Sequence, residues 1–471
     1  MAQPRWSGCV CRAVRRATWP SVALLVPAAL GAQTLTVSIP PNIVLPNYGR
    51  IPIGQREALE GGAFVARTDD VAANWYNPAG LVRSRGSAIN TSATTYEWTN
   101  LSVEGLGATA GRSRVSTIGS LFAAVIGQPI IKNDKVRFGF SMTRPVAWRP
   151  SGLDARATES QNGGTQQIDY AADVELSTYV PSIAVGYAPG GGQRGTLRLG
   201  VGLGLWWTEL SQAQTITGRG IAPADVGLLS RSYSAEGTAI RAVLIGGAQW
   251  DVRPNVVVGS RIVAPGPSLR GSTRLTYEAT ASTSASRAEL SFRDPEADFT
   301  YGVPLEVDGG VAVRAGRVEI EVDVRYYGPV GSYELYSSDS TGVLIQAPVA
   351  GNPTVSQVPF TAPRHSARSV VSVAAGSSYL VRRGLRVHAG FTTDPSPVEG
   401  GSDSPFREVD MFVATAGVSL TGTTISGSIG LGFSTGEGAR QVPDPAGGGV
   451  PLQTQLRVQS LNLLYALTYS F

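Results

Sequence analysis

Histidine, cysteine and paired aspartate are the residue types of this chain that could support catalysis or metal binding. The chain has two histidines, His365 and His388, and two cysteines, Cys9 and Cys11. Both cysteines precede an apolar stretch near the N-terminus, so the chain after it can form no disulfide, thiol nucleophile or thiolate metal site. Two histidines far apart in sequence do not indicate a histidine-rich metal site. The sequence therefore predicts no metal site and no cofactor.

Two narrower chemical interpretations remain. His388 lies next to a charged position on a face expected to be polar, where it could act as general base for a serine nucleophile. Serine and threonine occur throughout the chain, so no particular nucleophile is indicated. Asp69 and Asp70 could be a catalytic or metal-binding pair, but aspartates at such positions more often fix turns or cap short helices. We predict no catalytic residue and no enzymatic activity, with hydrolysis dependent on His388 as the alternative.

Most of the chain alternates between apolar and polar residues with a period of two. Side chains of a β-strand point alternately to opposite faces, so each such segment has one apolar face and one polar face. The segment Val318 to Tyr327 is the clearest case, and its polar face carries four charged residues: Glu319, Glu321, Asp323 and Arg325. Four charges on one face suit a hydrated lumen. About fourteen such strands can be traced between residue 86 and the C-terminus.

The connections between these strands alternate in length. Short connections fall at 189–195, 251–254, 315–317, 381–384 and 421–422. Long polar connections fall at 149–167, 211–232, 329–366, 395–408 and 436–452. Transmembrane barrels have short turns on one side, long loops on the other and an even number of strands. The sequence predicts an all-β transmembrane antiparallel β-barrel of about 14 strands, residues 86–471.

Two local features of the strands lead to further expectations. Leu456 and Val458 have the opposite parity to the residues from Leu461 onward, so we expect either a β-bulge near Gln459 or a later start of the last strand. Four tryptophans near strand ends are expected to form an aromatic girdle at the membrane interfaces. They are Trp98, Trp148, Trp206 and Trp207.

The N-terminus has the pattern of an export signal. A basic region precedes the apolar run Ser21 to Leu30, and small residues follow it, so we predict a signal peptide, residues 1–32, cleaved after Ala32. Four of the 39 basic residues lie in this segment, which leaves 35 basic and 35 acidic residues, so we expect no nucleic acid binding. An exported barrel is expected in the bacterial outer membrane, in contact with its lipid and lipopolysaccharide. We expect the barrel-assembly machinery to recognise the last strand, which ends at Phe471.

Residues 33–85 do not read as barrel strands. Prolines interrupt the first part, and a stretch of small residues from Gly61 to Leu81 follows, with aspartates and an Asn-Pro turn. This composition favours a compact plug. A fourteen-stranded barrel is wide enough to leak unless its lumen is filled, so we expect residues 33–85 to lie inside it.

The same stretch closely resembles the N-terminal hatch of the FadL-type outer-membrane transporters for long-chain fatty acids and other hydrophobic compounds. The matching elements are Gly62-Ala63-Phe64, Asp69-Asp70 and Asn77-Pro78-Ala79-Gly80-Leu81. Looser matches occur at residues 257–271, 305–326 and 385–398. Residues 33–60 are longer and richer in proline than the family's N-terminus, and their role is not assigned.

The resemblance implies passive transport of hydrophobic small molecules, such as long-chain fatty acids or aromatic hydrocarbons, through a plugged barrel with lateral release. It implies hatch or gating roles for Asp69, Asp70, Asn77, Pro78, Ala79 and Gly80, and a ligand path past Phe64, Trp75 and Tyr76. Lateral release would occur beside a kink in the third strand, Val136 to Trp148. Gly139 and Pro145 are its expected deforming residues, since proline cannot donate to a ladder. A general diffusion porin and a structural outer-membrane barrel are the alternatives.

Overall fold

The computed structural model describes most of the chain after the predicted signal peptide. The described residues are 37–38, 44–49, 53–84, 86–104, 110–127, 130–149, 153–161, 164–190, 196–220, 227–399, 406–442 and 452–471. The predicted signal peptide lies outside them, as does part of residues 33–52. Residues 35–471 form one compact unit.

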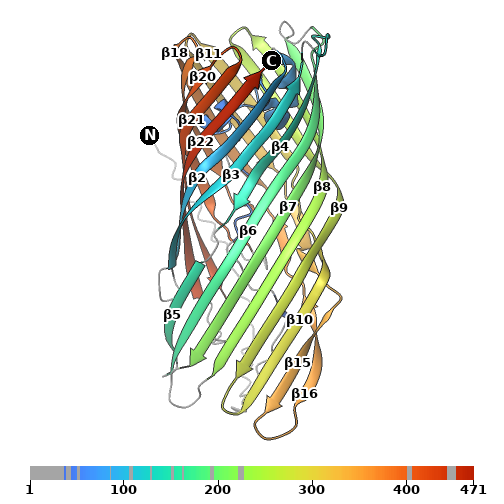
Figure 1. Ribbon diagram of the computed structural model, residues 1–471, viewed down its shortest axis with the longest axis vertical. Helices are drawn as coiled ribbons and strands as arrows, with labels where there is room; N and C mark the ends of the chain where they lie inside the picture. The colour runs from blue at the N-terminus through green and yellow to red at the C-terminus, as the bar shows by residue number, and fades with distance from the viewer. Residues whose placement is uncertain are drawn as a thin grey trace, which may run out of the picture. The chain divides into compact units, whose positions relative to one another are not determined.

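Antiparallel strands close into a barrel (Figure 1), and fourteen are found within the described residues. In order around the wall they are β2 (Ala88–Glu104), β3 (Ala110–Ile126), β4 (Val136–Trp148), β6 (Gly164–Tyr187), β7 (Leu197–Gly220), β8 (Leu228–Arg253), β9 (Val256–Ser282), a strand in two halves β10 (Ser286–Phe299) and β11 (Glu306–Ala315), β12 (Val318–Tyr327), β18 (Val370–Arg382), β19 (Leu385–Asp394), β20 (Asp410–Thr421), β21 (Ile425–Val442) and β22 (Leu452–Ser470). Pairing of β22 with β2 closes the circle. A further strand, β5 (Leu153–Gln161), pairs with residues 164–172 of β6, whereas β4 pairs with residues 176–187 of the same strand.

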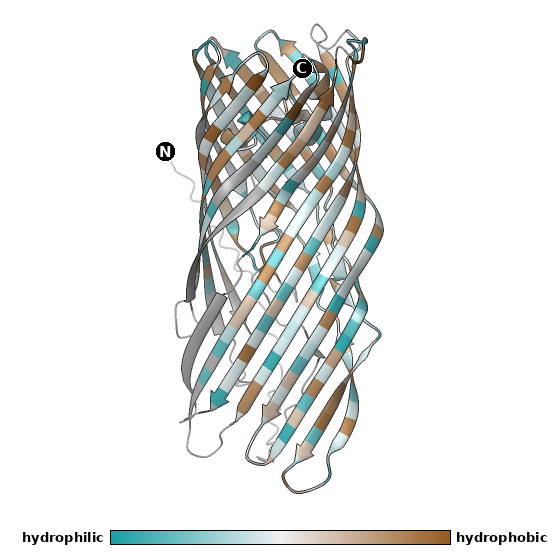
Figure 2. Cartoon of the chain, viewed as in Figure 1, coloured by the Kyte–Doolittle hydropathy of each residue, from teal (hydrophilic) through white to brown (hydrophobic). Residues whose placement is uncertain are grey.

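The outer surface carries an apolar band. In β7 the outward residues from Leu197 to Leu205 are all aliphatic and are between 41% and 59% exposed, whereas the outward positions that follow are Trp207, Glu209 and Ser211. The stretch from Leu197 to Trp207 is eleven residues long, and eleven residues of a tilted strand cover the roughly 25 Å apolar band of a transmembrane barrel. Figure 2 shows apolar residues recurring along the strands in this way. The predicted all-β transmembrane barrel is therefore confirmed. No helix among the described residues is both long and apolar enough to cross a membrane.

Short turns join the strands at the end of the barrel that holds the C-terminus, which we call the turn end. The predicted turns between β8 and β9, β11 and β12, β18 and β19, and β20 and β21 are all confirmed. Gly316 and Gly384 have positive φ values of 59° and 82°, which few other residues adopt at low cost. At the opposite end, the loop end, β6 to β9 continue far beyond the apolar band.

Three connections predicted as long loops are therefore wrong in part. Residues 211–220, 228–232 and 436–442 belong to strands β7, β8 and β21, and the predicted connection 149–167 contains β5 and the start of β6. Their outward positions are polar because they stand outside the membrane, so their composition resembles that of a loop although the ladder continues.

The interior of the loop end is apolar. Leu456 and Val458 point into it, and β22 keeps a continuous register with β21, so the bulge expected near Gln459 is wrong. Buried residues of β6 to β10 and β22 form one hydrophobic cluster there with Val44 and Leu45. The aromatic girdle was expected to contain four tryptophans. Trp98 is 53% exposed and Trp207 lies beside Tyr179, in agreement with that expectation. Trp148 and Trp206 are buried in the lumen, so the expectation is wrong for these two residues.

The connection between β12 and β18 has its own structure at the loop end. It contains β13 (Val330–Glu334), β14 (Tyr336–Ser337), β15 (Thr341–Pro348), β16 (Thr354–Thr361) and β17 (Arg364–Ala367). The hairpin β15–β16 extends the sheet beyond β10 (Figure 1), and β13 pairs with β17 as a separate ribbon. The short strand β1 (Val37–Ser38) pairs in parallel with β16.

Candidate functional site

Residues 53–84, which we call the luminal segment, lie inside the barrel at the turn end (Figure 1). The segment contains α1 (Arg56–Leu59), α2 (Ala73–Tyr76) and the 3-10 helix η1 (Pro78–Arg83). It is bonded to several sides of the wall. The backbone N–H of Phe64 donates to Asp323 of β12 at 2.8 Å, and the Thr415 hydroxyl of β20 donates to the Leu59 carbonyl at 2.9 Å. The segment therefore fills the width of the lumen.

Glycines of the wall give the luminal segment its seat. A Cβ built on any of five of them would lie under 3.0 Å from the segment's backbone: Gly186, Gly200, Gly259, Gly376 and Gly390. Four others face its side chains, Gly139 that of Asn74, Gly247 that of Asn77, and Gly417 and Gly430 that of Leu59. Only glycine permits such an approach of backbone to backbone. We call these nine residues the glycine cradle. The sequence did not reveal it, because each of these glycines meets a partner that is far away in sequence, and Gly139 alone was singled out, as a residue that deforms β4.

Ion pairs add a second set of contacts. Arg67 donates from Nε to Glu321 at 2.8 Å, lies 3.7 Å from Glu319 and also pairs with Glu60 of the segment itself. The backbone N–H of Ala66 donates to Glu321 at 2.6 Å. The charged face of β12 points into the lumen as expected, but its carboxylates bind the luminal segment, so the expectation that this face meets water is wrong.

Asn77 is the most extensively bonded side chain of the segment. It is fully buried, and its Nδ2 donates to the carbonyls of Val65, Ala248 and Ser260 at 2.8, 3.0 and 3.1 Å. Its Oδ1 accepts the N–H of Ala79 at 3.1 Å and caps η1. Asn77 thus ties η1 both to the segment and to β8 and β9. Pro78 and Ala79 pack against the cradle, and Gly80 lies against Thr68.

Asp69 and Asp70 both face Arg56, and the Asp70 contact measures 3.1 Å. Asp70 also accepts the N–H of Ala72 at 3.0 Å. These contacts are those of a turn held by an arginine.

His388 takes part in a chain of hydrogen bonds with the spacing of a catalytic triad. Its Nδ1 lies 2.7 Å from Glu60 and its Nε2 lies 2.8 Å from the Ser419 hydroxyl. Glu60 is occupied by Arg67 as well, and all three side chains are buried. A nucleophile needs access to its substrate, and the burial of Ser419 denies that access. The chain of bonds joins the luminal segment to β19 and β20.

The pairing between β3 and β4 stops part of the way along the wall. The two strands pair from Ile126–Phe138 to Leu121–Thr143, and the register of β4 with β6 shifts between Thr143 and Val146. Before this point outward residues of β4 are exposed, whereas every residue from Thr143 to Trp148 is buried. The strand has therefore turned inward at Pro145.

Gly139 lies in the part of β4 whose pairing with both neighbours is continuous, and its missing side chain leaves room for Asn74. Arg144, next to Pro145, fastens the turned strand to β6 through Ser177, with 2.6 Å between the guanidinium and the hydroxyl.

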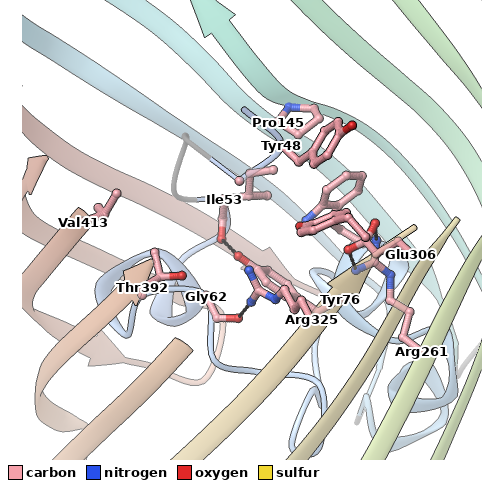
Figure 3. Close-up of a pocket in the computed structure, with 14 residues that line it drawn as sticks. Tyr48, Ile53, Gly62, Tyr76, Pro145, Arg261, Glu306, Arg325, Thr392 and Val413 are labelled. Carbon is pink, nitrogen blue, oxygen red and sulfur yellow. Dashed lines mark hydrogen bonds and ion pairs between the residues drawn. The ribbon is translucent and has the colours of Figure 1, made fainter. Parts of the chain in front are cut away.

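A small cavity lies where the turned strand, the luminal segment and the wall meet (Figure 3). Its volume is about 40 Å³. The lining residues are Tyr48, Gly49, Ile53, Gly61, Gly62, Trp75, Tyr76, Pro145, Arg261, Glu306, Arg325, Tyr327, Thr392 and Val413. A cavity of about 150 Å³ binds benzene, so a ligand entering this smaller cavity must displace some of these side chains.

The structure brings some of the expected residues to this cavity. Trp75, Tyr76 and Pro145 line it, with Arg261 stacked 5.1 Å from the Trp75 ring. Phe64 does not line it, because it is buried and stacked against Arg67, whose guanidinium lies 4.1 Å from the Phe64 ring.

Tyr48 was not expected here, since it belongs to the proline-rich residues without an assigned role. Its ring lies 4.8 Å from that of Tyr327, and Asn47 beside it donates to the carbonyls of Asp394 and Val409 at 2.7 and 3.0 Å. Residues 44–49 are therefore fixed in the lumen above the luminal segment.

Comparison with known proteins finds similarity of structure only. No protein-family model and no curated protein matches the sequence. The crystal structure of a FadL homologue from Pseudomonas aeruginosa superposes with a TM-score of 0.58 at 13% identity, covering 90% of this chain and 100% of that one. The toluene transporter TodX from Pseudomonas putida gives a TM-score of 0.55 at 14% identity, covering 89% and 99%. At such identities the similarity establishes a shared fold.

Proposed function

We propose that this chain is a FadL-type outer-membrane transporter that passively admits hydrophobic small molecules and releases them sideways into the membrane. The observation that carries the proposal is the interrupted wall between β3 and β4. Pro145 stands at that interruption and also lines the internal cavity. A ligand in the cavity would therefore be next to a part of the wall where no β3–β4 hydrogen bonds need to break.

The interior supports the same route. Its apolar loop end offers a ligand a favourable environment, since burying apolar surface contributes roughly 25 cal/mol per Å². Onward passage to the turn end is blocked by the luminal segment in its glycine cradle. Lateral release avoids an aqueous path in which such a ligand dissolves poorly, and no covalent step is required. The similarity in fold to a toluene transporter is consistent with this route.

In this proposal residues 33–85 are the hatch of the barrel, and short turns face the periplasm. The outward apolar band would contact outer-membrane lipid, and lipopolysaccharide would contact the strands beyond it. Phe471 directly follows the last strand and has an exposed ring, and its N–H donates to the Ser87 carbonyl at 2.9 Å. We propose it as the element that the barrel-assembly machinery recognises.

A general diffusion porin needs an open aqueous lumen. Among the described residues, two cavities that border Trp75 measure about 40 and 20 Å³. The filled lumen favours a transporter over a porin.

The test is uptake by a Gram-negative host that lacks its own hydrophobic-compound transporter, with this protein assembled in its outer membrane. The probes are radiolabelled toluene, hexadecanol and hexadecanoate. Uptake above that of the empty host for at least one probe is expected, and Pro145→Val, which can donate to a ladder, should reduce it several-fold. No uptake of any probe by correctly assembled protein would overturn the proposal.

A further inference from the structure

We propose that the cavity beside Pro145 selects uncharged ligands over carboxylates, with Glu306 as the specificity-determining residue. This inference rests on the proposed transport function and names its ligand class. The lining of the cavity contains three charged side chains, Arg261, Arg325 and Glu306 (Figure 3). A ligand carboxylate would bind there only if a guanidinium charge were not already balanced by carboxyl groups of the protein.

Arg261 is already committed to two carboxylates. Its Nη1 lies 2.9 Å from Glu306 and 2.6 Å from Asp308, and its Nη2 lies 3.3 Å from the other oxygen of Glu306. The Arg261 side chain is 3% exposed, so little of it remains accessible from the cavity. Its flat face is covered by Trp75.

Arg325 is held through one of its two terminal nitrogens. Its Nη2 donates to the carbonyl of Gly62 and lies 4.0 Å from Asp323. Around the cavity two guanidinium groups thus face three carboxyl groups, Glu306, Asp308 and Asp323. The carboxyl groups outnumber the guanidinium groups, so an incoming carboxylate would add a negative charge beside Glu306 with no cation left to balance it.

The remaining lining suits a ligand without charge. Aromatic rings of Tyr48, Trp75, Tyr76 and Tyr327 border the cavity, together with Ile53 and Val413. The Tyr76 hydroxyl donates to the Ile53 carbonyl at 2.9 Å, so its polar end is satisfied within the protein. Repulsion between a ligand carboxylate and Glu306 is strong here, because charge interactions are screened less inside the barrel than in water.

The experiment compares two ligands with the same chain and different head groups. Uptake of radiolabelled hexadecanol and hexadecanoate is measured at pH 7.5 in the host lacking its own transporter, and the uptake of the empty host is subtracted. We expect hexadecanol to enter faster than hexadecanoate by roughly tenfold. Entry of hexadecanoate at an equal or greater rate would overturn the inference and leave the transport function intact. Entry of neither would instead count against transport itself.

Charge variants separate the role of Glu306 from a general effect on the barrel. Glu306→Gln keeps the shape and an acceptor for Arg261, and should raise the hexadecanoate-to-hexadecanol ratio roughly tenfold. Arg325→Gln removes a cation and should lower that ratio. Glu437→Gln is the control, because Glu437 also pairs with an arginine, at 2.7 Å from Arg457, but lies exposed at the loop end. Each variant is first checked for the gel shift of an assembled barrel. An unchanged ratio in assembled Glu306→Gln and Arg325→Gln would refute the assignment.

Discussion

At the scale of single residues, Asn77 shows how much a short side chain can hold together. Its amide donates to the carbonyls of Val65, Ala248 and Ser260, and so joins the luminal segment to β8 and β9 at a close-packed boundary. Such boundaries tolerate little loss, since each buried group left unpaired costs free energy.

We expect Asn77→Ala to weaken the binding of the luminal segment to the wall by roughly 2–4 kcal/mol, because all hydrogen bonds of the Asn77 amide are lost. The barrel itself should still assemble, because its ladder does not depend on this side chain. The expected result is a steady ion current in planar bilayers and a change in hydrophobic uptake. Asn255→Ala, at an exposed turn, is the control. If the ion current through the variant is no larger than that through the native protein, Asn77 does not hold the luminal segment in place.

His365 lies at the loop end in the ribbon formed by β13 and β17, between the rings of Tyr333 and Phe406. Burial lowers the pKa of His365 from 6.5 to about 4. The unfolded ribbon therefore binds a proton at a higher pH than the folded ribbon does. Stability from the neutral ring is complete above pH 6.5 and is lost as the pH falls toward 4.

We accordingly predict that amide hydrogen exchange in residues 330–367 speeds up between pH 6.5 and pH 4 after correction for intrinsic rates. The loss of local stability should be on the order of 3 kcal/mol. His365→Phe should remove this pH dependence. If amide exchange in His365→Phe speeds up in the same way, groups other than His365 cause the pH dependence.

At the scale of elements, the membrane-spanning strands and their short turns were predictable, whereas the strands at the loop end and the seat of the luminal segment were not. Val136 to Trp148 was delimited correctly because alternation and the flanking turn residues are local signals. The inward turn at Pro145 was also a local signal, since proline lacks an N–H. Gly259 gave no such signal, because its partner Val65 lies far away in sequence and meets it only when the barrel closes.

The glycine cradle makes a prediction about β9. A side chain at Gly259 would collide with the backbone of Val65 and Ala66, whereas one at Gly309 of β11 would meet nothing within 4 Å. We expect Gly259→Leu to displace the luminal segment, at a cost of about 1–3 kcal/mol for overpacking. Gly309→Leu should leave the position of the luminal segment unchanged. Protease sensitivity of residues 53–84, measured in both variants after confirming barrel assembly, distinguishes them, and equal sensitivity would show that the cradle does not position the segment.

At the scale of the whole molecule, the barrel and its filling are held by separate sets of bonds. Fourteen strands close on one another through backbone ladders, and the luminal segment adds no strand to them. The segment is instead bound by side chains and by close packing at the cradle. It follows that the wall should persist when the filling is removed, and that the character of the emptied lumen is set by the side chains then exposed to water.

Deletion of residues 61–81 should therefore leave an assembled barrel with a permanent pore. Its lining would include the carboxylates of Glu319, Glu321 and Asp323, which lose Arg67 and the N–H groups of the segment as partners. Acidic side chains in a pore favour cations, so we expect a steady, cation-selective current in planar bilayers, with a reversal potential shifted toward that of the cation in a salt gradient. Glu321→Gln combined with Asp323→Asn in the deletion variant should weaken this selectivity without closing the pore. An anion-selective current would mean that arginines of the wall dominate the lumen, and no current from the assembled deletion variant would mean that other parts of the chain also fill it.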